Sequence, residues 1–204
     1  WTLVSVVYED QQTKERTPVL GEHPRGRQIA PADGRRLALV TGAGAVPCTI
    51  AALFREAGAE VSHVAEPVFE EAAMTKLFTP LAGLDILVNG SVRTGAWPLD
   101  RLTLDEWDRV QSINLRGAFL LMREAVRTMR AHSRGGRLIT ISTIGSLHPV
   151  LNGNFAYGAS RAGTNALMRQ FALDCVIDRI LSNAILVGAV PSDPFPEGMP
   201  TPTG

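Results

Sequence analysis

The sequence lacks any excess of charge of one sign, because its 204 residues contain 20 Lys plus Arg and 20 Asp plus Glu. A balanced charge gives no electrostatic basis for binding nucleic acid or an anionic membrane surface. No apolar run reaches the ~18–20 residues that a bilayer-spanning helix needs. We therefore expect neither nucleic acid nor a membrane as a partner.

Cysteine is also scarce, since Cys48 and Cys175 are the only two and form no CxxC pair. This usage predicts a reduced, cytoplasmic protein without a disulfide framework. The four histidines share no spacing typical of a metal site, so we expect none. The chain begins with Trp1 and lacks the charged, apolar and cleavage regions of a signal peptide, which indicates a fragment or a processed chain.

Residues 1–36 differ in composition and in hydrophobic pattern from the rest of the chain. A β-branched apolar run over 1–8, a polar stretch and then Thr17-Pro18-Val19-Leu20 predict a hairpin. Gly, Pro and charged residues dominate 21–34, as in a linker. We expect residues 1–36 to form a hairpin arm and linker, and residues 37–204 to form one domain with a short Pro-rich C-terminal tail.

From residue 37 onward the pattern of apolar strand, turn and amphipathic helix repeats. Strands are predicted over 37–41, 61–65, 85–89, 137–142 and 183–187, and helices over 47–57, 69–78, 104–131 and 155–179. Thr103 and Glu106 fit a capping box at the start of the third helix. Strands that are apolar throughout and alternate with helices indicate a parallel sheet covered on both faces. The prediction is an α/β, doubly wound, Rossmann-like sheet.

Two connections are short for a complete fold of this type. Only 19 residues separate Ala65 from Asp85, whereas two crossovers with a strand between them need roughly 30. The 16 residues after Gly188 include five prolines, which disfavour a further helix and central strand. We expect five strands, with the sheet trimmed at both edges.

Six segments resemble, in order, the motifs of the short-chain dehydrogenase/reductase family. They are Thr41-Gly42 (its TGxxxGxG turn), 84–89 (the strand before NNAG), 113–115 (the helix-borne Asn), 139–145 (the serine strand), 157–163 (the YxxxK helix) and 183–188 (the strand ending in Pro-Gly). The resemblance implies NAD or NADP as cofactor, a small carbonyl or alcohol substrate, and an oligomer built through the two long helices. It implies cofactor contacts from Thr41, Gly42, Gly44, Asn89 and Gly188.

The phosphate-binding turn departs from the family pattern. Val46 and Cys48 stand at its second and third glycines, and Pro47 stands at the third glycine of the general GxGxxG fingerprint. A branched side chain obstructs the approach to a pyrophosphate, and proline removes an N–H donor. Each lost hydrogen bond to a charged partner costs about 1.5–3 kcal/mol. We therefore predict weak or absent binding of NAD or NADP.

The resemblance also implies the catalytic residues. Tyr157 corresponds to the family's acid/base, and Arg161 takes the place of its lysine, keeping a positive charge one helical turn away. The hydroxyl that binds the substrate oxygen is Ser142 by the S-x-x-G spacing and Thr143 by position along the strand. The two side chains point to opposite faces of a regular strand. Asn114 corresponds to the residue that completes a proton path.

Three functions remain open. The favoured one is a subunit with a degenerate NAD(P) site that acts within a homo-oligomer or beside an intact short-chain dehydrogenase. The second is an active carbonyl reductase or alcohol dehydrogenase that uses Tyr157. The third is a redox-free lyase resembling the halohydrin dehalogenases, which carry Ser, Tyr and Arg.

Overall fold

The computed structural model describes residues 7–9, 16–18 and 36–188. The chain divides into two units, residues 1–34 and 35–204, and each is described by itself. In the first, β1 (Val7–Glu9) pairs antiparallel with β2 (Arg16–Pro18). The rest of the predicted arm and linker, and the predicted tail from residue 189, lie outside the described residues.

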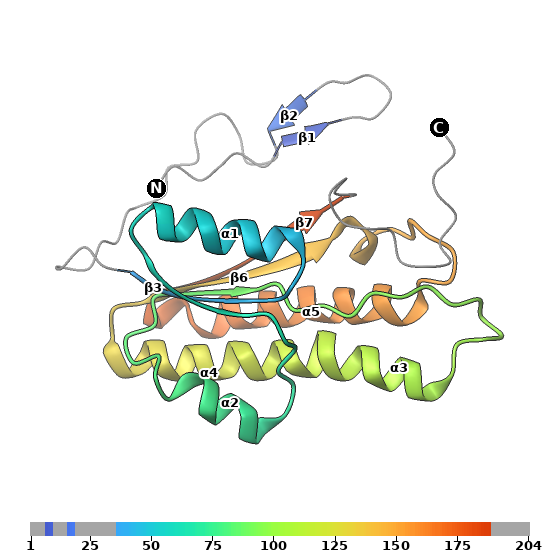
Figure 1. Ribbon diagram of the computed structural model, residues 1–204. Helices are drawn as coiled ribbons and strands as arrows, with labels where there is room; N and C mark the ends of the chain where they lie inside the picture. Colours follow the sequence, from blue (N-terminus) through green and yellow to red (C-terminus); the bar gives the residue numbers. More distant parts are fainter. Residues whose placement is uncertain (1–6, 10–15, 19–35, 189–204) are drawn as a thin grey trace. The chain divides into compact units, whose positions relative to one another are not determined.

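A parallel sheet forms the centre of the second unit (Figure 1). Within residues 36–188 it has five strands, in the order β4 (Glu60–Val64), β3 (Leu37–Thr41), β5 (Ile86–Asn89), β6 (Gly136–Thr143) and β7 (Ile180–Val187). All four neighbouring pairs are parallel. This confirms the predicted five-stranded α/β sheet, with β4 and β7 at its edges.

The helices agree with the predicted segments but differ at their ends. They are α1 (Ala45–Glu56), α2 (Glu71–Phe78), α3 (Leu104–Gln111), α4 (Gly117–His132) and α5 (Phe155–Asp174), with short 3₁₀ turns at Ile144–Ser146 and Val176–Asp178. A π-turn, Ser112–Arg116, separates α3 from α4, so the predicted single helix over 104–131 is wrong in this respect. The predicted start of α1 at Pro47 lies two residues late. The fifth strand begins at Ile180, because the helix before it ends earlier than predicted.

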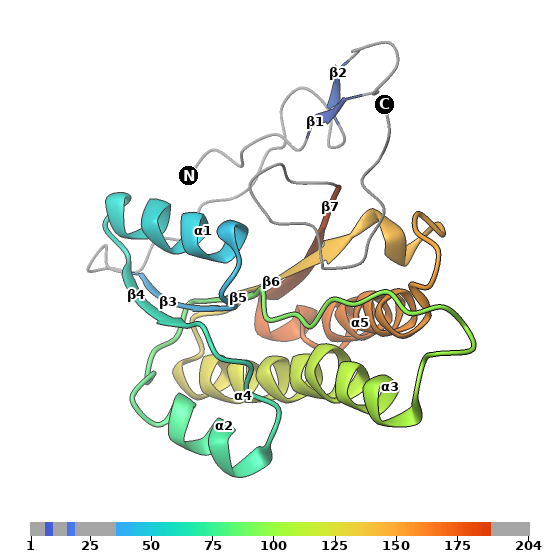
Figure 2. The same ribbon diagram turned by 45° about the vertical axis from the view of Figure 1, so that its right-hand side comes forward.

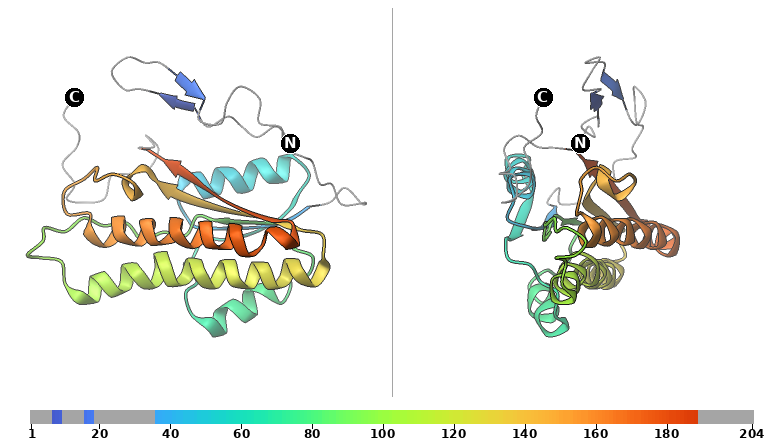
Figure 3. Two further views of the ribbon diagram at one scale, coloured as in Figure 1. Left: turned by 180° about the vertical axis from the view of Figure 1, so that it is seen from behind. Right: turned by 90° about the vertical axis from the view of Figure 1, so that its right-hand side faces the viewer.

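Helices cover both faces of the sheet (Figures 2 and 3). On one face α1 packs over a small core built around Val40, Val88 and Ile141. On the other face α2, α4 and α5 cover the larger core, in which Leu39, Leu87 and Leu138 point away from the first set. Leu138 and Ile141 of β6 thus lie on opposite faces of the sheet. Because side chains alternate along a strand, even-numbered residues of β6 face α5 and odd-numbered residues face α1.

Candidate functional site

The turn after β3 is held by contacts within the protein. Gly42 has φ +111°, and a Cβ there would lie 2.4 Å from the carbonyl oxygen of Gly90. Its N–H donates to the Val64 carbonyl at 2.9 Å, and its own carbonyl oxygen lies 2.8 Å from His63 Nε2. The backbone of the β5 end thus requires glycine at position 42.

Pro47 occupies the third position of α1 and is buried. Its ring lies against the β5 end, because a Cβ on Gly90 would come within 2.6 Å of Pro47 Cγ. The first three amides of an α-helix have no partner inside the helix and are the donors available to a phosphate. Of these three, the one at Pro47 does not exist. Gly44 is the N-cap of α1 and its carbonyl accepts from the Cys48 N–H at 3.2 Å.

Cys48 is exposed in the first turn of α1. The first turn of α1 is amphipathic, and Val46 packs on the core while Cys48 faces outward. Its Sγ reaches the carbonyl oxygen of Ala43 at 3.5 Å. A side chain therefore stands at each of the two positions where the family turn has its later glycines.

Two other candidate cofactor residues lie side by side in the sheet. Thr41 of β3 pairs with Asn89 of β5, which in turn pairs with Thr140 of β6. All three are buried, and Thr41 Oγ1, Asn89 Nδ2 and Thr140 Oγ1 have no partner within the described residues. Gly188 follows the edge strand β7 and is exposed. Thr41 and Asn89 form one polar row across the sheet, and Gly188 is not part of it.

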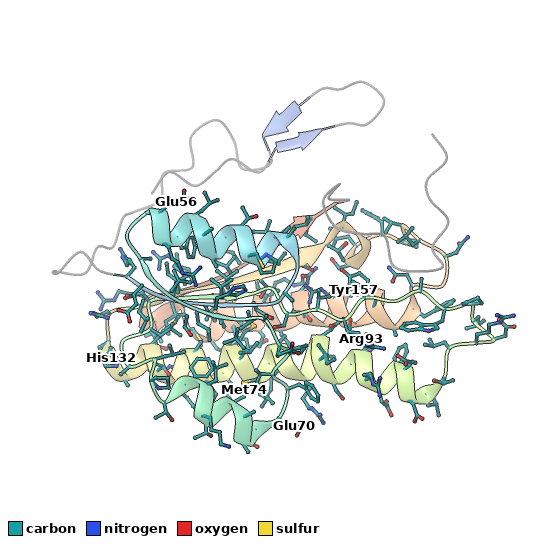
Figure 4. The ribbon with its side chains drawn as sticks, in the orientation of Figure 1. Glu56, Glu70, Met74, Arg93, His132 and Tyr157 are labelled. Carbon is teal, nitrogen blue, oxygen red and sulfur yellow. The ribbon has the colours of Figure 1, made fainter. Side chains whose placement is uncertain are left out.

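Tyr157 lies in the first turn of α5, at the carboxyl ends of the strands, and is half-buried. Figure 4 places it at the same end of the fold as Arg93, away from His132. Arg161, one turn further along the same helix, is only 2% exposed. Its Nη2 donates to the carbonyl oxygen of Ile141, while Nε and Nη1 have no partner within the described residues. Burial lowers the pKa of the Arg161 guanidinium, and the electrostatic interaction with the nearby Tyr157 hydroxyl opposes that shift.

The two candidate hydroxyls point to opposite faces, because β6 and β7 pair regularly through Ser142 and Thr143. Ser142 faces the α5 side, is 4% exposed, and its Oγ has no partner within the described residues. Thr143 is half-buried, and its Oγ1 accepts from the Gly145 N–H at 3.2 Å. That bond uses a lone pair of Thr143 and leaves its O–H free to donate.

Asn114 is fully buried in the π-turn. Its Oδ1 accepts from the Arg93 N–H at 2.8 Å, and its Nδ2 donates to the Arg93 carbonyl at 2.9 Å and to Ser160 Oγ at 3.0 Å. Its own carbonyl accepts from Thr164 Oγ1 at 2.9 Å. The Asn114 side chain therefore joins the segment after β5 to α5.

Several residues of this network were missed from the sequence. Ser160 donates to the Tyr157 carbonyl at 2.7 Å, and Asn165 donates to Ser146 Oγ at 2.7 Å. The buried polar residues of α5 are Ser160, Arg161, Thr164 and Asn165. Residues spaced one, three and four apart lie on one face of an α-helix. The pattern of polar residues at this spacing is therefore the signal that could have identified the buried polar face of α5 from the sequence.

Among the described residues, no helix combines the length and the apolar composition that a membrane span needs. No group of three or more His, Cys, Asp or Glu side chains there has the arrangement of a metal site.

The parallel five-stranded sheet with helices on both faces and the glycine turn after β3 define a doubly wound, Rossmann-like α/β protein. The family model described as "short chain dehydrogenase" matches residues 51–197. The chain belongs to the short-chain dehydrogenase/reductase family.

Similar proteins support this assignment. Versicolorin reductase stcU of Emericella nidulans is 30% identical over 193 residues, covering 80% of this chain and 72% of that protein. The uncharacterized oxidoreductase YohF of Escherichia coli is 32% identical over 118 residues, covering 58% of this chain and 46% of that one. The crystal structure of acetoin dehydrogenase from Enterobacter cloacae superposes with a TM-score of 0.68 at 25% identity, covering 76% of this chain and 74% of that one. The chain spans about half the length of the first curated relatives, 46% and 55%.

Proposed function

We propose that this chain is an oxidoreductase-family subunit with a weakened NAD(P) site, which acts within a homo- or hetero-oligomer. The observation that carries the proposal is Pro47, whose ring lies against Gly90 and which has no N–H to donate from the first turn of α1. The residues of the turn thus fit a pyrophosphate poorly.

The oligomer is supported by the outer faces of α4 and α5. A groove between these helices and the π-turn is lined by Leu115, Phe119, Gly163 and Leu167, among others. Phe119 is exposed, and a Cβ on Gly163 would lie 3.0 Å from Leu115. Small residues beside exposed apolar ones suit close packing of a second copy or of an intact family member.

Direct titration with NADH and NADPH tests the proposal. We expect no saturable binding below about 1 mM, which corresponds to less than about 4 kcal/mol of affinity. Calorimetry measures the binding, and light scattering on a sizing column measures the oligomer. Micromolar binding of either dinucleotide to the chain alone would refute the weakened site.

An active carbonyl reductase is the second candidate, and the position of the buried Arg161 one turn after Tyr157 on α5 favours it. A reduced nicotinamide would supply the hydride to the carbonyl carbon. Tyr157 would give its hydroxyl proton to the carbonyl oxygen, while Ser142 or Thr143 would donate a hydrogen bond to that oxygen. We favour Thr143 for this contact, since it is half-buried and Ser142 is enclosed. Substituting Thr143→Val should then lower turnover more than Ser142→Ala does, and the reverse order would assign the role to Ser142.

The same buried Arg161 suits the redox-free alternative, which has its own assay. Release of chloride from a chlorohydrin, lost in Tyr157→Phe, would support the lyase over both other functions.

A further inference from the structure

The segment between β6 and α5 presents an apolar rim beside Tyr157. Ile144, Leu147, Val150, Leu151 and Phe155 are each between 42% and 59% exposed. All lie in the short stretch that joins the candidate hydroxyls to the start of α5. Exposed apolar side chains that gather in one place mark binding surfaces, whereas single ones are common on any protein.

Packing ties this rim to the candidate catalytic residues. A Cβ on Gly145 would lie 3.0 Å from Val150 Cγ2, and a Cβ on Gly158 would lie 3.7 Å from the Gly145 carbonyl oxygen. Gly158 is the residue after Tyr157. Val150 is therefore held next to the turn of α5 that carries the candidate acid/base.

A second segment, residues 91–99 after β5, extends the rim. The Trp97 N–H donates to the Gly153 carbonyl at 2.9 Å, and a Cβ on Gly153, whose φ is +75°, would lie 2.6 Å from the Trp97 carbonyl oxygen. Val92 and Leu99 in this segment are exposed as well. Figure 1 shows both segments at the N-terminal end of α5.

Charge is scarce around this opening. Residues 144–155 contain no Asp, Glu, Lys or Arg, and His148 is their one titratable side chain. Arg93 is the one charged residue of 91–99, and its Nη2 pairs with Glu106 at 2.9 Å. Arg161 is buried beneath. An anionic substrate would find no unpaired exposed cation in these two segments.

We propose that the site takes an uncharged, bulky apolar ketone or the corresponding secondary alcohol, seated on the rim of Ile144, Leu147, Val150, Leu151 and Phe155. Keto acids and small polar ketones are excluded as good ligands, because the first bring a charge without a partner and the second cover too little apolar surface. The assignment rests on the proposed use of Tyr157, and it names the substrate class of that site.

The test is calorimetric titration of the full chain, without nicotinamide cofactor, with 2-decalone, pyruvate and hydroxypropanone. We expect 2-decalone to bind with a submillimolar Kd, and the other two at least tenfold more weakly. Leu147→Asp should weaken 2-decalone binding at least tenfold, because it places a charge on the rim. Val150→Asp should weaken 2-decalone binding to the same extent, and it replaces Leu147→Asp in the test if that variant does not fold.

Ile177→Asp is the matched control. Ile177 is 86% exposed in the 3₁₀ turn after α5, at the opposite end of that helix from Tyr157, so this variant should bind 2-decalone like the parent. Equal loss in the control, or pyruvate binding as tightly as 2-decalone, would overturn the proposal. So would a change of oligomeric state in Leu147→Asp with ketone binding intact, which would make the rim a contact between copies. These ketone-binding measurements contain no cofactor, so the result of the NADH titration does not affect them. The proposal of a weakened NAD(P) site and the proposal of an apolar ketone can therefore be refuted independently.

Discussion

Replacing Pro47 with alanine should strengthen dinucleotide binding while destabilising the fold. Alanine restores an N–H at the third position of α1, in the first turn, where an amide has no acceptor four residues earlier within the helix. One hydrogen bond to a charged phosphate contributes about 1.5–3 kcal/mol. The expected gain in affinity for NADH or NADPH is therefore about 10- to 150-fold.

The loss of stability has a separate origin. Pro47 is buried, and its ring packs against the backbone of Gly90 and Gly42. Alanine removes two ring methylenes, and each buried methylene contributes about 0.8 kcal/mol. Proline also restricts the unfolded chain, which adds about 0.4–1 kcal/mol to the loss. We expect the free energy of unfolding to fall by about 2 kcal/mol.

Two measurements on one preparation decide the matter. Nicotinamide fluorescence reports the affinity, and urea denaturation reports the stability. Pro149→Ala is the control, since Pro149 is exposed in the segment before α5: it should lose only the ~0.4–1 kcal/mol that comes from the freer unfolded chain, and it should leave the dinucleotide affinity unchanged. If Pro47→Ala binds dinucleotide no more tightly than the parent, the missing amide is not what weakens the site.

Three further predictions concern the packing of the site and of the core. Asn114→Ala removes the partner of the half-buried Arg93 N–H and carbonyl, and should lower the free energy of unfolding in urea by about 2–4 kcal/mol; a loss below 1 kcal/mol would contradict the network. Gly42→Ala should abolish soluble folded protein on expression, because its Cβ would clash with a carbonyl oxygen, whereas Gly58→Ala at φ +84° in open space should cost only about 1–3 kcal/mol. Burial raises the pKa of the Cys175 thiol, so the unfolded chain loses its proton first and stability should fall as the pH rises above about 8.5. Thermal unfolding from pH 7 to 10 should show a smaller fall for Cys175→Ala, and parallel curves would argue against the shift.

Most of the fold could be predicted because hydrophobic periodicity and turn chemistry act locally. The five strands are apolar runs with turns after them, and their pairing in parallel follows from the helices between them. The sequence also predicts the helix N-cap at Thr103, and in the structure Thr103 Oγ1 accepts a hydrogen bond from the Glu106 N–H at 3.2 Å. Such signals lie within a few neighbouring residues and need no tertiary context.

The differences arise where tertiary contacts decide. The apolar stripe continues from α3 into α4, so nothing local reveals the π-turn that turns Asn114 toward Arg93. Proline is tolerated anywhere in the first turn of a helix, so Pro47 could not distinguish a start at Ala45 from one two residues later. The burial of Arg161 depends on the approach of α5 to the Ile141 carbonyl, which no single segment encodes.

The two halves of the site are held by different contacts, which is why one can weaken without the other. Tyr157 is positioned by a network that is complete within the protein, through Ser160, Asn114 and the backbone of Arg93. The phosphate turn, by contrast, is shaped by the contact of Gly42 and Pro47 with Gly90 and offers fewer donors to a ligand. Loss of dinucleotide affinity would leave the first network unchanged, since none of its hydrogen bonds involves residues 41–48. A family member with this division can keep the shape of its catalytic end, and any oligomer contact through α4 and α5, after its cofactor binding has declined.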